Sequence, residues 1–363
     1  MRKTISICLM SFAMLLVSCS VKVMDIAVPD GLQLSPDGEW LLLHKDQKCS
    51  LVNLKSGKTK VVSCGAVWLP NSNRYSYMQA TRDGYRLVSA DPLLNSETIL
   101  ARKLPSCNYR ISPTGDYMVL TVPVAGALEN QSYLLRYNLK NGNVEQITAD
   151  TICTRLMDIS QDGKKVLYMT YHAGITDSTK CVASIFEKSI DGVEVRYFDR
   201  PIPLVDNACF TPSGDAIAIR ATKSGLGGMY LPFLNEDENP EDRNVIKLKG
   251  GNIEKDTRLL AVHMKKTIGD IKSYVWNVMD DKIYAIGNLN GYDVLVQFDM
   301  NIYSIPLAPG IITMKQISRP EENVVCFSLA DRSPVGVWQS MDRNGKSHLY
   351  KFNIDSLVYV PVE

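Results

Sequence analysis

The sequence has little histidine, almost no net charge and no zinc-binding spacing of cysteine. Four histidines occur among 363 residues, and none forms the His-x-His or His-Glu-x-x-His pattern of a metal site. The 40 lysines and arginines nearly balance the 39 aspartates and glutamates, which leaves a net charge of +1. This balance gives no electrostatic reason to expect a nucleic-acid partner. No Cys-x-x-Cys pair and no Gly-x-Ser-x-Gly nucleophile motif is present, and we expect no cofactor.

The N-terminal residues have the pattern of an export signal rather than of a folded element. Two basic residues precede an apolar stretch over residues 5–17, which is followed by Ser18 and Cys19. The apolar stretch is too short for a stable membrane span. This order resembles a bacterial lipoprotein signal, in which cleavage leaves the cysteine first and lipids attach to it. We therefore expect a signal peptide over residues 1–18 and a lipidated anchor and linker over residues 19–30.

A lipid anchor at Cys19 would make the membrane the first partner of the protein. Each buried lipid methylene contributes about 0.8 kcal/mol, so several acyl chains hold a protein firmly. No later stretch of the sequence is long and apolar enough to span a membrane. We expect a folded domain tethered in the bacterial cell envelope, at the outer membrane, on either its periplasmic or its surface side.

The other cysteines do not predict a disulfide framework. Seven remain outside the signal and the anchor: Cys49, Cys64, Cys107, Cys153, Cys181, Cys209 and Cys326. An odd number leaves at least one without an intramolecular partner. All seven lie beside apolar, strand-like residues, where cysteine behaves as a small buried hydrophobe. We expect buried thiols, with disulfides as the alternative that an exported protein permits.

A strand–turn–strand pattern recurs along the chain. Its clearest copy is Ser35-Pro36-Asp37-Gly38, followed by the apolar strand 40–43. Proline fixes φ at the first turn position, aspartate bonds its own backbone, and glycine supplies the positive φ that closes the turn. Close copies occur at 112–115, 160–163 and 211–214, and weaker equivalents are expected at 69–73, 277–281 and 318–322.

The repeated unit predicts the fold. Each copy opens a group of four short strands, the groups repeat about every 40–50 residues, and no long amphipathic helical pattern separates them. Four strands in a repeat of this length are typical of a β-propeller. We predict that residues 31–363 form a single all-β propeller domain of about seven blades, with six or eight also compatible. Tyrosines of the second strands should pack between blades: Tyr75, Tyr77, Tyr117, Tyr168 and Tyr284.

The turn phrase resembles the blade repeats of TolB and of the N-terminal propeller of prolyl oligopeptidase-type peptidases. The match is complete at Ser35-Pro36-Asp37-Gly38 and close at the three copies named above. The resemblance implies a closed ring of blades that covers nearly the whole mature chain. It implies little about activity, because those peptidases keep their catalytic residues in a separate hydrolase domain and fold alone does not determine function.

Candidate site residues follow from the propeller geometry. The first strand of each blade lines the central channel, and the loops leading into these strands gather at one mouth, opposite the Ser-Pro-Asp-Gly turns. Three positions before the turn proline, or its equivalent, five units carry Gln33, Val67, Arg110, Asp158 and Cys209, and we place Asn277 there in the sixth. The polar members, with two asparagines five positions before the turn, are our candidate ligand-binding residues: Gln33, Asn108, Arg110, Asp158, Asn207 and Asn277. The alternative is that Arg110 and Asp158 pair with each other across a wet channel.

These features favour a non-catalytic binding or scaffolding role, with a protein, peptide or glycan ligand at the channel mouth. A sensor of envelope state is a related interpretation that the sequence does not separate from it. The alternative is a propeller enzyme that acts on polysaccharide, as a lyase or glycoside-processing enzyme, with a metal at the mouth. Its ligands would come from the four histidines, His44, His172, His263 and His348.

Overall fold

The computed structural model of the protein describes residues 31–94, 96–126, 131–150, 152–171, 182–197, 202–203, 207–212, 214, 217–220, 229–230, 271–277, 279–280, 282–299 and 313–362. The regular structure of these residues is entirely β, and they contain no helix that could cross a membrane. The predicted signal peptide and linker, Cys181, His172 and His263 lie outside the described residues.

The first three sheets follow one another along the chain. Sheet 1 contains β1 (Gly31–Leu34), β2 (Trp40–Lys45), β3 (Lys48–Asn53) and β4 (Thr59–Val62). Sheet 2 contains β5 (Val67–Trp68), β6 (Tyr75–Thr81), β7 (Gly84–Ala90) and β8 (Glu97–Leu104). Sheet 3 contains β9 (Tyr109–Ile111), β10 (Tyr117–Pro123), β11 (Ser132–Asn138) and β12 (Val144–Gln146).

The remaining sheets continue in the same order. Sheet 4 contains β13 (Cys153–Ile159), β14 (Lys165–Tyr171), β15 (Val182–Ser189) and β16 (Glu194–Arg196), and β17 (Ile202–Pro203) also pairs with β15. Sheet 5 contains β18 (Asn207–Phe210), β19 (Ile217–Arg220) and β20 (Met229–Tyr230). Sheet 6 contains β21 (Ile271–Asn277), β22 (Lys282–Leu289), β23 (Tyr292–Asp299) and β24 (Thr313–Gln316). Sheet 7 contains β25 (Asn323–Leu329), β26 (Val335–Met341), β27 (Ser347–Asn353) and β28 (Tyr359–Pro361).

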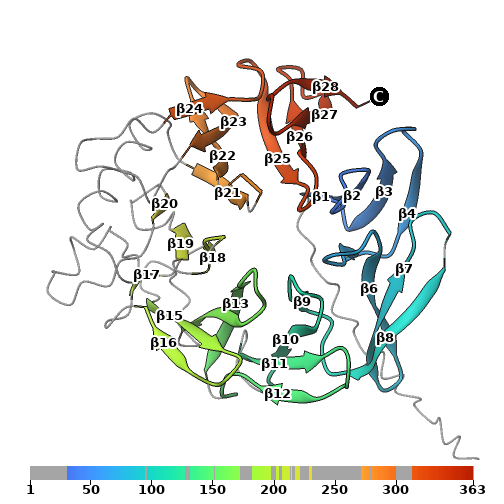
Figure 1. The fold of residues 1–363 in the computed structure, drawn as a ribbon, viewed down its shortest axis with the longest axis vertical. Helices are drawn as coiled ribbons and strands as arrows, with labels where there is room; N and C mark the ends of the chain where they lie inside the picture. The colour runs from blue at the N-terminus through green and yellow to red at the C-terminus, as the bar shows by residue number, and fades with distance from the viewer. Residues whose placement is uncertain are drawn as a thin grey trace, which may run out of the picture.

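These sheets are the blades of a β-propeller. Figure 1 shows them following one another around a ring in chain order, from blue sheet 1 to red sheet 7. Neighbouring strands are antiparallel, and six of the seven sheets contain at least four strands; the described part of sheet 5 contains three. The all-β propeller class is confirmed, and the described sheets, six of them with four or more strands, lie within the six to eight blades that the sequence repeat allowed.

The repeated turn joins the first and second strands of a blade, as predicted. In blade 1, the Gly38 amide donates to the Ser35 carbonyl at 2.9 Å, with φ of 74° at Gly38. The Ser35 hydroxyl donates to Asp37 at 2.5 Å and accepts from the Trp40 amide at 2.9 Å. Blade 4 repeats this arrangement at Ser160 and Asp162. The polar turn residues therefore satisfy the backbone of the turn itself.

The predicted position of the turn in the seventh unit is wrong. Residues 319–322 connect β24 of blade 6 to β25, which is the first strand of blade 7. The equivalent turn lies at 330–334, where the Ala330 amide donates to the Val335 carbonyl as Ser35 does to Trp40. Both loops carry a proline and acidic residues, so turn composition alone did not distinguish the loop that precedes the first strand from the one that follows it.

The ring closes where blade 7 meets blade 1, and the described strands of these two blades are not exchanged between them. The Leu34 amide donates to the Ser328 hydroxyl at 2.9 Å, and the Arg332 amide donates to the Pro36 carbonyl at 3.0 Å. The apolar part of this contact contains buried residues of both blades: Leu34, Leu41, Val52, Ala330 and Val337. Burial of such side chains stabilises the closed ring by about 25 cal/mol for each Å² removed from water.

The second-strand tyrosines belong to the core, as predicted. Tyr75, Tyr77, Tyr117, Tyr168 and Tyr284 are all at most 8% exposed. Two of their hydroxyls donate to glutamates: Tyr77 to Glu97 and Tyr168 to Glu194, both at 2.5 Å. These rings pack between blades and are not available as a partner surface.

Candidate functional site

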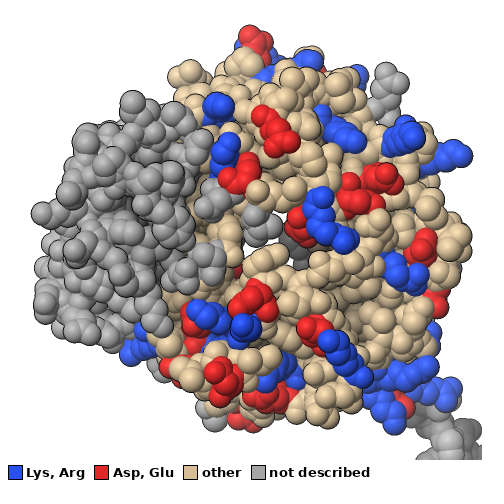
Figure 2. All heavy atoms as spheres, viewed as in Figure 1, with Lys and Arg blue, Asp and Glu red and all other residues tan. Residues whose placement is uncertain are grey.

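The centre of the ring is hollow. A cavity of about 1090 Å³ extends along the first strands to the ends of β10 and β14, and one of about 440 Å³ opens among the turns that follow the first strands. The two share Arg110, Val275 and Asp331 in their walls, so they form one channel. We call its end near the starts of the first strands the upstream mouth, and the other end the turn mouth. Figure 2 shows the hollow at the centre of the molecule.

One position of each first strand faces this channel. It lies two residues before the first residue of the turn, and its seven occupants all line one or both cavities: Gln33, Val67, Arg110, Asp158, Cys209, Val275 and Ser328. We aligned the blades by a backbone hydrogen bond that repeats at their turns. In it, the amide of the first turn residue donates to the carbonyl five residues later, as at Ser35, Ser112 and Ser160. The channel-facing position predicted in the first five units is thus where the structure places it.

The sixth and seventh blades differ from the sequence prediction. Asn277 pairs with Lys282 across the turn, which makes it equivalent to Ser35 and places Val275 at the channel-facing position. Its side-chain amide donates to Asp280 at 2.7 Å and its oxygen accepts from the Met279 amide at 3.4 Å. Asn277 therefore stabilises the turn, although it also borders the turn mouth. Ser328 was not predicted, because the turn of the seventh unit was misplaced.

Arg110 and Asp158 form an ion pair between blades 3 and 4. Arg110 Nη1 lies 3.1 Å from Asp158 Oδ1 and donates to the Met157 carbonyl at 2.5 Å. The other Asp158 oxygen accepts from the Phe210 amide of blade 5 at 2.8 Å. Burial raises the pKa of Asp158, while Arg110 and the amide bonds act to lower it. The pairing that we considered as the alternative for these two residues is what the structure shows.

The remaining predicted residues have different surroundings. Gln33 joins blades 1 and 2: its side-chain oxygen accepts from the Trp68 amide at 3.2 Å, and its carbonyl accepts from Trp68 Nε1 at 2.9 Å. Asn108 is exposed and lines the larger cavity. Asn207 is the first residue of β18, and its backbone pairs with that of Arg220. The structure describes the backbone of Asn207 but not its side chain.

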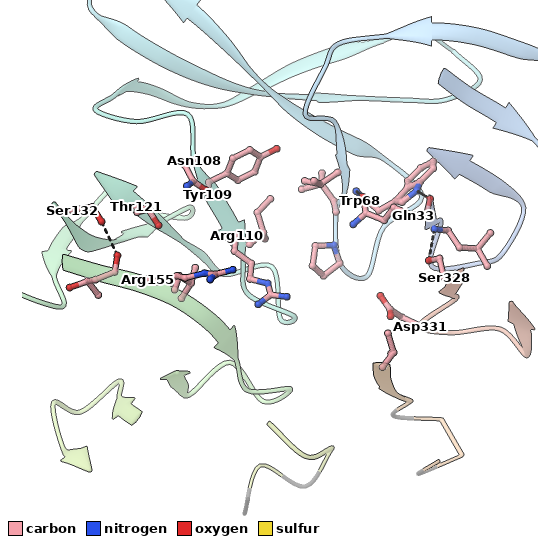
Figure 3. Close-up of a pocket in the computed structure, with 18 of the residues that line it drawn as sticks. Gln33, Trp68, Asn108, Tyr109, Arg110, Thr121, Ser132, Arg155, Ser328 and Asp331 are labelled. Carbon is pink, nitrogen blue, oxygen red and sulfur yellow. Dashed lines mark hydrogen bonds between the residues drawn. The ribbon is translucent and has the colours of Figure 1, made fainter. Parts of the chain in front are cut away.

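Two charged residues of the channel were missed by the sequence analysis. Arg155 and Asp331 are both exposed to the channel and line the larger cavity. Figure 3 shows Arg110 and Arg155 on one wall and Asp331 on the other. The surrounding blades shield the Asp331 carboxyl and raise its pKa, against a smaller opposing effect of Arg332.

Arg155 was missed because strand β13 contains a bulge. Strict alternation places residues 155 and 158 on opposite faces of a strand. The pairing of β13 with β14 shifts between Leu156 and Asp158, which leaves Met157 as an extra residue. Such a bulge reverses the alternation, so Arg155 and Asp158 both line the channel. Nothing in the sequence itself marks this bulge.

The described histidines do not gather at the channel. His44 is buried in β2, where burial lowers its pKa, and its Nε2 lies 3.8 Å from the Cys49 sulfur. His348 in β27 lies 3.3 Å from Asp342 Oδ2. Within the described ranges, no three His, Cys, Asp or Glu side chains are grouped to hold a metal ion. The six described cysteines outside the signal are thiols rather than disulfides, and Cys49 and Cys153 are buried.

Comparison with known proteins identifies the fold class and no closer relationship. No protein-family model matches the chain, and no curated protein matches it in sequence. Solved structures do match. The Pyrococcus horikoshii acylaminoacyl peptidase has a TM-score of 0.60 at 10% identity over 92% of this chain. The propeller domain of the Pyrococcus furiosus trilobed protease has a TM-score of 0.58 at 13% identity, also over 92% of this chain.

The tricorn protease is a third match, with a TM-score of 0.55 at 11% identity over 92% of this chain. This chain spans 52% of the acylaminoacyl peptidase and 34% of the tricorn protease, but 98% of the isolated trilobed-protease propeller. These similarities support the assignment of the chain to the β-propeller fold. At such low sequence identity, structural similarity indicates the fold but not the activity.

Proposed function

We propose that this protein is a lipid-anchored β-propeller of a bacterial cell envelope that binds a peptide or glycan non-covalently in its central channel. The observation that carries the proposal is the channel itself. Its larger cavity, about 1090 Å³, is of the size that small-molecule and short-peptide sites occupy, and polar groups converge on apolar walls within it, as in binding pockets generally.

The polar groups of the channel suit binding more than covalent chemistry. Arg110 and Asp158 are engaged with each other, and Gln33 is engaged with Trp68. A general base or nucleophile needs a partner within hydrogen-bonding reach that activates it. Among the described lining residues no serine–histidine or cysteine–histidine pair of this kind occurs. No described feature favours the enzyme alternative, so binding is the function we put forward.

The envelope location rests on the N-terminal sequence, whose basic start, apolar stretch and Ser18-Cys19 resemble a lipoprotein signal. A channel protein held at a membrane by its first residue can capture envelope material while it remains in place. In this proposal the lipid holds the protein at the membrane, and the central channel of the propeller binds the ligand.

A binding screen tests the proposal. The full chain, extracted in mild detergent, is applied to arrays of short peptides and of oligosaccharides from bacterial envelopes. We expect reproducible binding to one of these classes, with the eluted ligand chemically unchanged. Absence of binding to both classes contradicts the proposal, and so does conversion of any bound glycan to shorter or unsaturated products.

A further inference from the structure

Two polar side chains on the upstream wall of the channel have no partner among the described residues. Arg155 is exposed in β13, and its guanidinium makes no hydrogen bond or ion pair within that part of the chain. Asn108 is bonded through its backbone only, to Ser106 and Thr121. Both residues are exposed and line the larger cavity, so a ligand in the channel can reach both side chains.

Arg155 also supplies charge that the described channel wall does not balance. The lining residues include three arginines, Arg110, Arg155 and Arg332, but only two acidic residues, Asp158 and Asp331. Arg110 pairs with Asp158 at 3.1 Å, and Arg332 acts on the neighbouring Asp331. Arg155 therefore remains as the excess positive charge. In a partly enclosed channel such a charge is screened less than on an open surface.

The chemistry of these groups identifies their missing partner. A guanidinium presents two parallel N–H donors that match the two oxygens of a carboxylate. The Asn108 side-chain amide adds a neutral donor, and both residues line the same cavity. Figure 3 shows Arg155 and Asn108 on the same side of the channel. We propose that the upstream part of the channel binds the carboxylate of a ligand, with Arg155 as its main donor.

This inference rests on the proposed binding function and names the group that is recognised. A ligand carboxylate has two sources in the classes proposed above, the C-terminus of a peptide and the acid group of a sugar. The same cavity also has aliphatic lining residues, Val67, Leu156 and Val275, and these can contact the uncharged remainder of either ligand. Both kinds of ligand carry one carboxylate on a small molecule that is otherwise uncharged.

The test is calorimetric titration of the detergent-solubilised full chain. The probes are a tripeptide with a free C-terminus, the same tripeptide amidated, glucuronate, its methyl ester, and inorganic phosphate. We expect one of the two carboxylates to bind at least tenfold more tightly than its neutral counterpart and than phosphate. Whichever carboxylate binds identifies its source.

Variants locate the binding. Arg155→Gln should weaken the preferred carboxylate about 10–100-fold, as expected for loss of a charge-assisted bidentate contact. Arg155→Lys should retain part of the affinity, because lysine keeps the positive charge but lacks the two parallel N–H donors of the guanidinium. Asp331→Asn should strengthen binding several-fold by removing an opposing charge. Arg82→Gln, an exposed arginine in the turn between β6 and β7, is the matched control and should leave affinity unchanged.

Three results overturn the inference. Equal affinity for acidic and neutral probes shows that the channel binds ligands without reading a carboxylate, and it leaves the proposed binding function intact. An Arg155→Gln protein with wild-type affinity and wild-type melting temperature places the carboxylate elsewhere. Phosphate binding as tight as carboxylate binding contradicts the commitment to a carboxylate. Absence of binding to every probe, together with empty peptide and glycan arrays, is instead the failure of the proposed function.

Discussion

At the scale of single residues, Asp158 shows how a channel position can serve both structure and charge. Its carboxylate contacts Arg110 of blade 3 and the Phe210 amide of blade 5. Its side chain is only 18% exposed. Burial of the carboxylate is the dominant influence and raises its pKa, while the arginine acts in the opposite direction. Ionisation of Asp158 therefore costs more free energy in the folded protein than in the unfolded chain.

This cost makes a prediction about pH. A raised pKa means that the native state holds the Asp158 proton more tightly than the unfolded chain. The resulting stabilisation is complete below the ordinary pKa of about 3.9 and is lost as the pH rises through the raised value. We expect the stability of Asp158→Asn relative to the wild type to increase between about pH 4 and pH 7, measured by urea unfolding at each pH. A relative stability that stays constant or falls would show that the Arg110 ion pair outweighs the burial.

At the scale of the elements, the contact between blades 1 and 7 holds the ring closed. Among the described strands none is shared between these blades, and the contacts seen between them are two hydrogen bonds, the apolar cluster and the packing of their turns. Gly38 lies where the turns of blades 1 and 7 meet. A Cβ there would meet Ser333 Oγ at 2.8 Å and Val335 Cβ at 2.9 Å of blade 7. A methyl group at residue 38 would force the two blades apart.

A pair of glycine substitutions isolates this contact. Gly38 and Gly345 have nearly the same φ, 74° and 76°, but a Cβ at Gly345 meets nothing within 4 Å. Gly345→Ala should cost only the backbone strain, about 1–2 kcal/mol. Gly38→Ala should cost about 1–3 kcal/mol more through overpacking. Equal losses in melting temperature would show that blade 1 and blade 7 are not held by this contact.

The elements also show how far the sequence predicts the structure. Turn composition located the strands of blades 1 to 6, because proline, aspartate and glycine act locally at each turn. It failed in blade 7, where the loops at 319–322 and 330–334 have similar composition. The channel-facing residues of the first five blades followed from counting back from the turn. Arg155 did not, because the bulge at Met157 depends on pairing with β14, which no local pattern of β13 reveals.

At the scale of the whole molecule, the proposed lipid anchor and the channel have separate roles. Cys19 precedes the first described strand by 12 residues, so we expect lipidation at Cys19 to leave the stability of the ring unchanged. Cys19→Ser should abolish incorporation of a palmitate analogue and move the protein from the membrane fraction to the soluble fraction, with unchanged melting temperature. Cys8→Ser, within the signal, is the control and should leave both properties unaltered. Labelling of the Cys19→Ser protein would disprove lipidation at this residue.

The channel is the only part of this account that assigns a function, and filling it is the most direct test. Val275 is 40% exposed and lines both cavities, whereas Val61 is 78% exposed on the outer strand β4. Val275→Trp places a large side chain in the channel, and Val61→Trp places the same side chain on the rim. The measurement is the affinity of each variant for the ligand selected on the arrays. The account predicts a loss of at least tenfold for Val275→Trp and none for Val61→Trp. Undiminished binding by a correctly folded Val275→Trp protein would contradict it.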